Sequence, residues 1–118
     1  MRPRKKKRRK ISAHFSTSDF ACTNEAGESR CRISLGLVGG LELLRSKSNN
    51  RIAILKGYSD PGTTAKQYNR DYHTLGLAAD IRIENMSIHD VFLLAQSIPE
   101  FKGVGLNLDE EHVHVDMR

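Results

Sequence analysis

Apolar residues recur at a helical spacing in two parts of the chain. Between residues 33 and 46 they return every three or four positions, which predicts a helix. A second helix is predicted over residues 88–98, because its apolar residues keep to one side of a helical period. Ser87 can cap this helix, with Asp90 as its third residue, and Pro99 stops it.

Alternating or continuous apolar positions predict the strands. The predicted strands cover residues 51–58, 77–83, 103–106 and 112–117. A long polar loop, residues 59–72, joins the first two strands, and loops of this length in compact domains are usually functional. Residues 13–32 show little periodicity and are expected to form loops with short turns. This order predicts the α+β class, with a small antiparallel sheet and helices packed on one face.

The positive charge of the chain is concentrated at its beginning. The formal net charge is +5, but residues 1–10 hold eight of the 19 basic residues and no acidic one. Residues 11–118 therefore carry eleven basic against 14 acidic residues, or −3. A run of like charge repels itself, so we expect residues 1–12 to be a disordered basic arm and residues 13–118 a single domain. The arm is either a solvated leader or a tether to an anionic polymer or lipid surface.

Other features of the composition narrow the functional classes. The chain has no Trp and few aromatic residues, which argues against a stacking surface for nucleic acid. No stretch is long and apolar enough to span a membrane, and residues 11–16 do not form the apolar segment of a signal peptide. We expect a monomer that is cytoplasmic as synthesised. The two cysteines, Cys22 and Cys31, neither prove nor exclude a disulfide.

Polar residues of two predicted strands share one face of the sheet. In the last strand, alternation directs the valines toward the core and places His112, His114 and Asp116 together on the opposite face. In the strand at residues 77–83, Asp80 lies opposite an apolar face in the same way. The plain explanation is a solvated sheet face, but a second strand of the same design favours a binding site.

His73 completes a candidate metal site. It lies seven residues before Asp80, and Gly76 between them permits a tight turn that brings the imidazole back over the strand. Two histidines and one carboxylate are the protein ligands of an open zinc site, with water in the fourth position. Zinc lowers the pKa of that water toward about 7, which yields a nucleophile at neutral pH. The sequence therefore predicts one zinc ion per chain, held by His73, Asp80 and a histidine of the last strand, His112 or His114.

These residues resemble the motifs of a known family, the D-alanyl-D-alanine carboxypeptidases, which are zinc peptidases that share a fold with the Hedgehog signalling domain. The metal motifs are the most specific part of the likeness, which covers about residues 13–118. The matching segments are residues 73–80 and 112–116, with weaker matches at residues 14–16, 19–22, 57–58 and 101–105.

The resemblance implies a zinc metallopeptidase that hydrolyses a peptide bond in peptidoglycan stem peptides at D-alanine, as a carboxypeptidase or an endopeptidase. Its substrate would be peptidoglycan or a muropeptide, so an exported chain would work in the cell wall or periplasm. By the same resemblance His73, Asp80 and His114 are the zinc ligands, and His112 is the catalytic histidine. Glu111 has the spacing of the base in the vancomycin-resistance branch and is the alternative. Asp116 is expected to orient a metal-bound histidine.

Two positions depart from the family pattern. Ser59 stands where the family has an Arg that is thought to stabilise the substrate carbonyl or carboxylate, and Asp71 replaces a Ser. The candidate substrate-binding residues are Tyr58, Ser59 and Arg70, with Lys56 and Arg82 as further sources of positive charge. The alternatives are a catalytically silent, zinc-containing module that binds the cell wall, and a nucleic-acid-associated protein that acts through the basic arm.

Overall fold

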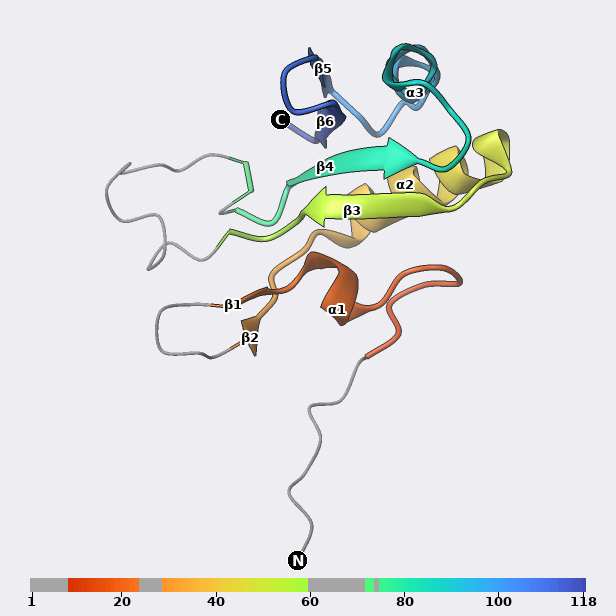
Figure 1. Cartoon of the computed structure of the whole chain (residues 1–118). Helices are drawn as coiled ribbons and strands as arrows, with labels where there is room; N and C mark the ends of the chain where they lie inside the picture. Colours follow the sequence, from red (N-terminus) through yellow and green to blue (C-terminus); the bar gives the residue numbers. More distant parts are fainter. Residues whose placement is uncertain (1–8, 24–28, 60–71, 74) are drawn as a thin grey trace, which may run out of the picture.

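The computed structural model describes residues 9–23, 29–59, 72–73 and 75–118 (Figure 1). The helices are α1 (Thr17–Phe20), α2 (Leu35–Ser48) and α3 (Ile88–Gln96). The strands are β1 (Cys22–Thr23), β2 (Ser29–Arg30), β3 (Ile52–Lys56), β4 (Ala78–Ile83), β5 (Gly103–Asn107) and β6 (His112–Asp116). Four of them form an antiparallel sheet in the order β3-β4-β6-β5, and β1 pairs with β2 in a separate two-stranded sheet. The α+β class is therefore confirmed.

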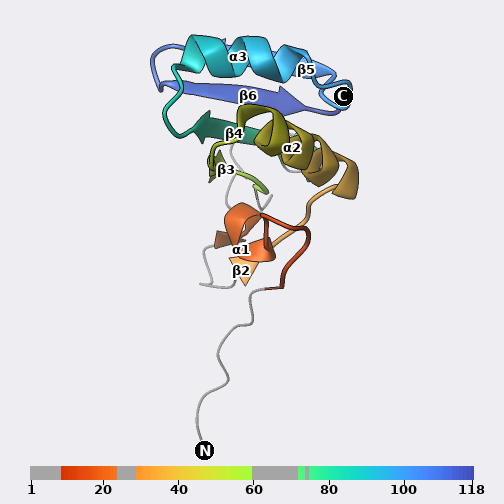
Figure 2. The ribbon, with the colours of Figure 1, turned by 90° about the vertical axis from the view of Figure 1, so that its right-hand side faces the viewer.

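The pairing of β4 with β6 separates the two faces of the sheet. Asp80 lies opposite His114, and the next pair along is Ile81 opposite Val113. Because directly opposite residues share a face and neighbouring pairs alternate, the polar pair and the apolar pair lie on opposite sides of the sheet. Helices α2 and α3 lie together on the apolar side (Figure 2).

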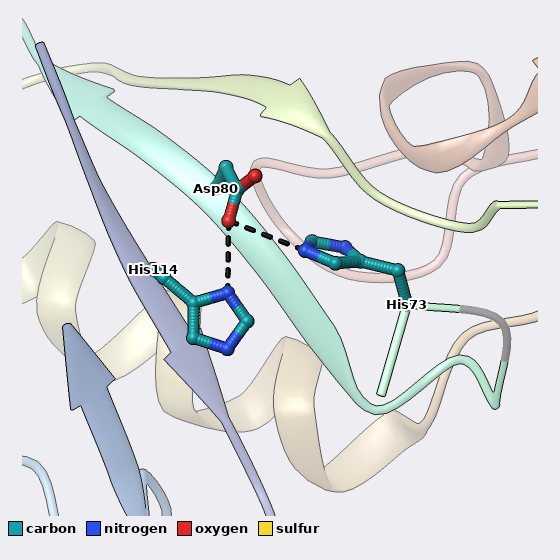
Figure 3. A group of neighbouring side chains, drawn as sticks. All are labelled: His73, Asp80 and His114. Atoms are coloured by element: carbon teal, nitrogen blue, oxygen red, sulfur yellow. Dashed lines mark hydrogen bonds and ion pairs between the residues drawn. The ribbon is translucent and has the colours of Figure 1, made fainter. Parts of the chain in front are cut away.

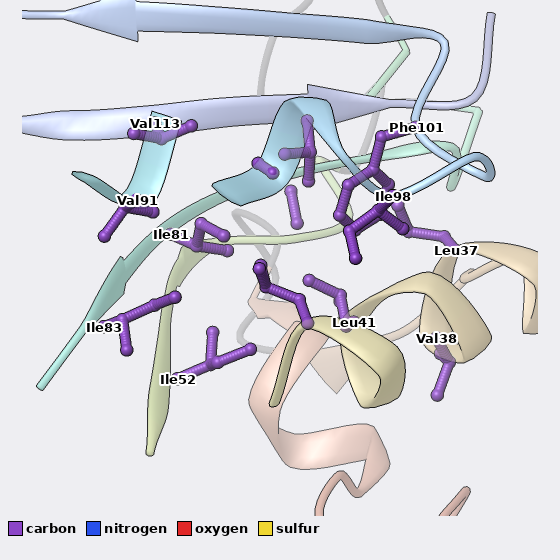
Figure 4. Packing of buried hydrophobic residues seen from close by; sticks show 14 of the residues in the cluster. Leu37, Val38, Leu41, Ile52, Ile81, Ile83, Val91, Ile98, Phe101 and Val113 are labelled. Carbon is purple, nitrogen blue, oxygen red and sulfur yellow. The ribbon is translucent and has the colours of Figure 1, made fainter. Parts of the chain in front are cut away.

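The hydrophobic core fills the space between these helices and the sheet (Figure 4). Its fully buried members include leucines of α2 and small apolar residues of α3, β4 and β6. They are Leu37, Leu41, Leu44, Val91, Ala95, Ile81, Val113 and Val115. Burying a Leu, Ile or Val side chain completely contributes about 1.5–3 kcal/mol, so the core on this face is the main source of stability.

The capping residues set the helix boundaries. Helix α2 begins after Ser34, whose hydroxyl accepts hydrogen bonds of 3.1 and 3.4 Å from two N–H groups of the first turn. It ends at Asn49, which takes a left-handed conformation with φ of 54°. The predicted helix at residues 33–46 was therefore displaced by two residues. The predicted start of α3 was correct, because Ser87 Oγ accepts from the N–H of Asp90 at 3.2 Å.

The chain contacts the domain from residue 9 onward. The N–H of Thr17 donates to the carbonyl of Arg9 at 2.8 Å. The Ser12 hydroxyl donates to Glu42 on α2 at 2.5 Å. Residues 9–12, which belong to the predicted arm, are therefore bonded to the domain, and residues 1–8 lie outside the described part of the chain.

Short elements occupy the segment that was predicted as loops and turns. Residues 13–32 contain α1, β1 and β2, each of only two to four residues. Elements of this length contain too few apolar positions to show a period. Within the described ranges, no helix is both long and apolar enough to cross a lipid bilayer.

Candidate metal centre

Three side chains meet on the polar face of the sheet (Figure 3). Asp80 comes from β4, His114 from β6 and His73 from the segment before β4. His114 Nδ1 lies 2.9 Å and His73 Nε2 lies 3.3 Å from the same carboxylate oxygen, Oδ1 of Asp80. One ligand atom from each residue lies within 4.8 Å of the other two. The structure thus brings together the ligand set predicted from the sequence.

A tight turn carries His73 to this position. Gly76 has φ of +73°, and its N–H donates to the carbonyl of His73 at 3.1 Å. A Cβ atom at position 76 would lie 2.5 Å from the carbonyl oxygen of Arg32, so a side chain does not fit there. The predicted role of this glycine is confirmed, because both the positive φ and the close backbone contact require it.

Hydrogen bonding fixes the tautomer of His73. Its Nδ1 lies 2.9 Å from the carbonyl oxygen of Gly57, which can only accept. In a neutral ring Nδ1 therefore carries the proton, and Nε2 directs a lone pair at the Asp80 carboxylate. An ionised carboxylate is also only an acceptor, so this contact of 3.3 Å requires a proton or another cation between the two atoms.

His114 also requires a proton or another cation beside its ring, because each of its ring nitrogens faces a carboxylate. Nε2 lies 2.8 Å from Oδ2 of Asp116, while Nδ1 lies 2.9 Å from Oδ1 of Asp80. A neutral imidazole has one N–H and can satisfy only one of these acceptors. If Nε2–H donates to Asp116, the free lone pair of Nδ1 points at Asp80. One cation beside Asp80 Oδ1 would satisfy both histidines, so the donor set fits a divalent metal ion such as zinc.

Protons compete with a metal for these lone pairs. The hydrogen bond to Asp80 raises the pKa of His114, burial opposes it, and the hydrogen bond to Asp116 adds to the rise. Burial acts to raise the pKa of Asp80, but hydrogen bonds from His114 and His73 hold it well below its usual range. The site therefore keeps the Asp80 carboxylate ionised inside the protein.

Asp116 lies where an orienting partner for His114 was expected. Its side chain is fully buried, and Arg118 binds it through Nε at 3.0 Å and Nη2 at 2.9 Å. Burial favours the neutral acid, but these hydrogen bonds lower the pKa of Asp116 to about 2. The carboxylate is therefore ionised at neutral pH and accepts from His114 Nε2, an arrangement typical of metal-bound histidines.

His112 and Glu111, the two candidates for proton transfer, occupy different environments. His112 is buried, and its Nε2 lies 3.5 Å from Oδ2 of Asp80, so three imidazoles surround one carboxylate. This contact was not anticipated from the sequence. Glu111 precedes β6 with φ of 53°, and its side chain is exposed. Within the described residues it forms no ion pair or hydrogen bond with the three candidate ligands.

Two of the candidate substrate-binding residues lie beside the metal centre. Ser59 is buried, and its N–H donates to the carbonyl of His73 at 3.2 Å. Tyr58 is half-buried and its N–H donates to the carbonyl of Phe20 at 2.8 Å. The hydrogen bond of Ser59 therefore joins this segment to His73, whereas that of Tyr58 joins it to the end of α1. Arg70, like Asp71, lies outside the described residues.

The other two sources of positive charge differ in their contacts. Arg82 is engaged with a turn, because Nε donates to the carbonyl of Glu111 at 2.6 Å and Nη2 to that of Glu110 at 3.0 Å. Lys56 is exposed and lies opposite Asp80 in the register of β3 with β4. Of these two side chains, Lys56 is the better placed to meet a ligand at the metal centre.

Comparisons with known proteins found no relative for this chain. No family model matches it, and neither the curated proteins nor the solved structures include a significant match. The resemblance to the D-alanyl-D-alanine carboxypeptidases remains an expectation, and it rests on the motif residues alone. The metal centre itself rests on the distances and hydrogen bonds described above.

Proposed function

We propose that the chain is a zinc-dependent peptidase that hydrolyses a peptide bond at D-alanine in peptidoglycan stem peptides. One observation carries the metal part of this proposal: His73 and His114 both direct a ring nitrogen at the same oxygen of Asp80. When bound, zinc supplies Lewis acidity and lowers the pKa of a coordinated water. The choice of substrate rests on the resemblance of residues 73–80 and 112–116 to the carboxypeptidase motifs.

His112 is proposed as the residue that moves the proton. Its ring adjoins the ligand set without belonging to it, since Nε2 lies 3.5 Å from Oδ2 of Asp80. A positioned acid–base group of this kind contributes typically about 10²–10⁴-fold to the rate. Glu111 is the alternative, and it would have to turn from its exposed position to reach a substrate.

Lys56 is proposed to bind the carbonyl or carboxylate of the substrate in place of the arginine that Ser59 replaces. It lies opposite Asp80 on the neighbouring strand, and its side chain is exposed. A cation there would stabilise the negative charge that develops on a peptide carbonyl during hydrolysis. Arg70 remains a second candidate on the basis of the sequence alone.

Metal content is the first test. We expect about one zinc per chain in the purified protein, as three-ligand sites hold. His73→Ala, Asp80→Ala and His114→Ala should each lose most of it by elemental analysis. His89→Ala is the matched control, because His89 is an exposed histidine of α3 that is not part of the candidate ligand group. Zinc retained in all three ligand variants would overturn the assignment.

Product identification is the second test. Zinc-loaded protein is incubated with purified peptidoglycan and with stem peptides, and the products are identified by mass. Release of D-alanine or of a shortened stem peptide supports the peptidase. At matched zinc occupancy, His112→Ala should abolish most turnover and Glu111→Gln should keep it; the reverse would exchange their roles. Full zinc occupancy without turnover on any substrate would instead identify a silent wall-binding module.

A second candidate activity is the binding of an anionic wall polymer, and a cleft on the folded domain favours it. The cleft has a volume of about 800 Å³ and lies between residues 10–19, α2 and the start of β3. Its lining includes three cations, Lys10, Arg45 and Arg51, and one carboxylate, that of Asp19. Lys10 is itself one of the basic residues of the arm, so we expect the arm and the cleft to attract the same anionic ligand.

Salt dependence tests this second candidate. We expect the full chain to bind purified poly(glycerol phosphate) at low salt and to lose that affinity as salt rises. Deleting residues 1–8, or combining Arg45→Gln with Arg51→Gln, should weaken binding and leave turnover of a soluble stem peptide unchanged. Unaltered binding in both variants contradicts the tether. A clear preference for DNA over the wall polymer would favour the nucleic-acid alternative.

A further inference from the structure

Arg118 contacts residues next to both candidate histidine ligands. Its guanidinium binds both oxygens of Asp116, and its own backbone N–H adds a third hydrogen bond to Oδ1 at 3.1 Å. Its carbon Cζ also lies 5.3 Å from the centre of the Tyr72 ring, within the range of a cation–π contact. Asp116 is the acceptor for His114 Nε2, and Tyr72 directly precedes His73.

The surroundings of Asp116 are built to hold its carboxylate in one place. The side chain is 0% exposed, and a Cβ atom at position 103 would lie 2.4 Å from Oδ1. Gly103 on β5 therefore leaves the space that the carboxylate occupies. A buried carboxylate requires a compensating charge, and in the described structure Arg118 supplies it. The bidentate fork also fixes the orientation of the carboxylate, which a point charge would not do.

We propose that Arg118 is a positioning residue for the metal centre. It holds Asp116 against His114 and holds Tyr72 beside His73, so both imidazoles face Asp80 before a metal binds. The inference rests on the proposed metal site and adds a residue to which neither spacing nor motif assigns a role. Among the described residues, Arg118 forms no hydrogen bond or ion pair with Asp80 or the histidine rings, so it acts through Asp116 and Tyr72.

Loss of Arg118 has a defined consequence for His114. Without the guanidinium, the buried Asp116 carboxylate would lose two hydrogen bonds and its compensating charge, so it would no longer be held against His114 Nε2. The ring could then rotate or change tautomer, and Nδ1 would no longer be held as the atom that faces Asp80. Outer-shell partners of this kind are typically worth about 10–100-fold in metal affinity.

The test combines zinc affinity with a readout that needs no metal. Zinc dissociation constants are measured by competition with a chromogenic chelator for the wild type, Arg118→Ala and Arg118→Lys. We expect about a 10–100-fold loss for Arg118→Ala and only partial recovery in Arg118→Lys, because lysine offers no bidentate fork. Lys47→Ala is the control, since Lys47 is an exposed cation of α2 whose side chain donates to Ser97 Oγ at 3.4 Å and has no part in either candidate site.

The second readout is the ¹H–¹⁵N spectrum of the imidazole rings in metal-free protein. The His114 signals should show a protonated Nε2 in the wild type and change in Arg118→Ala. Unchanged ring signals together with unchanged zinc affinity would overturn the proposal. A wild type that binds no zinc but shows the ring effect would contradict the proposed function and leave the positioning role intact. If Arg118→Ala does not fold, Tyr72→Ala tests the second contact in the same two assays.

Discussion

Gly76 offers the sharpest test of how the fold builds the metal centre. Its φ of +73° and the 2.5 Å approach of a Cβ to the carbonyl oxygen of Arg32 both exclude a side chain. The same turn is closed by the hydrogen bond from the N–H of Gly76 to the carbonyl of His73. Substitution by alanine should therefore lower stability and displace His73 together.

Two effects determine how much Gly76→Ala should lower the free energy of unfolding. Placing alanine in a left-handed conformation costs about 1–2 kcal/mol. Relieving a contact with a backbone oxygen, which cannot rotate away as a side chain can, adds about 1–3 kcal/mol. Gly76→Ala should thus reduce the free energy of unfolding by about 2–5 kcal/mol. At about 4 °C per kcal/mol for a domain of this size, the midpoint of thermal unfolding falls by roughly 8–20 °C.

The assay compares thermal unfolding and zinc affinity with those of a matched glycine variant. Gly39→Ala is the control, because Gly39 is exposed within α2 and nothing lies within 4 Å of an added Cβ. That change should raise stability by about 0.5–1 kcal/mol, since glycine is unfavourable inside a helix. Zinc affinity should fall at least about tenfold in Gly76→Ala, as for other losses of outer-shell support, and stay constant in Gly39→Ala.

Two results would refute this reasoning. If Gly76→Ala unfolds at the same temperature as the wild type, the turn does not have the conformation described here. If it is destabilised as expected but binds zinc with unchanged affinity, the turn supports the fold without positioning His73. A double variant, Gly76→Ala with His73→Ala, separates the effect on stability from the effect on zinc binding. Its free energy of unfolding should match that of Gly76→Ala, and its zinc affinity should be no higher than that of His73→Ala.

Three further predictions concern stability. Leu41→Ala should lower the free energy of unfolding in urea by about 2.7–5 kcal/mol because its side chain is fully buried, whereas Leu43→Ala, at a position 37% exposed, should cost much less. Burial tends to raise the pKa of Glu42, but hydrogen bonds from Ser12 and His14 lower it overall. The ionised form of Glu42 is therefore favoured in the folded state. Its contribution to the free energy of unfolding is complete above about pH 5 and disappears as pH falls below the ordinary pKa near 4.3. In a pH series of unfolding curves, Glu42→Gln should remove this pH-dependent contribution. Chelation of zinc should lower the unfolding midpoint of the wild type and leave that of Asp80→Ala unchanged, as measured by differential scanning calorimetry.

The sequence predicted the division between core and site because strands have a period of two. Alternation around Val113 and Ile81 placed the apolar residues on one face, and His114 and Asp80 then had to share the other. The role of Gly76 could be predicted for a related reason, since glycine readily adopts the positive φ that a tight turn requires. These inferences depend on local backbone geometry, which is readable over a few residues.

Other contacts form between segments that are distant in the sequence, and the spacing of residues along the chain does not predict them. The contact of His112 with Asp80 requires both the register of β6 with β4 and the rotamers of two side chains. Arg118 and Tyr72 are far apart in the chain and meet only because β6 and the turn before β4 end at the same place. The start of α2 was misplaced because Ile33 fits the helical period, although Ser34 caps the helix after it.

The placement of the core on one face of the sheet and of the candidate ligands on the other has a consequence for how this protein can change over time. Because α2 and α3 pack on the face opposite Asp80, the domain has a source of stability that does not involve metal coordination. This differs from zinc fingers, in which metal binding is the folding free energy. A chain that lost His73 or His114 would lose the candidate metal site and keep its shape, so descendants without this site but with an intact scaffold are accessible by single substitutions.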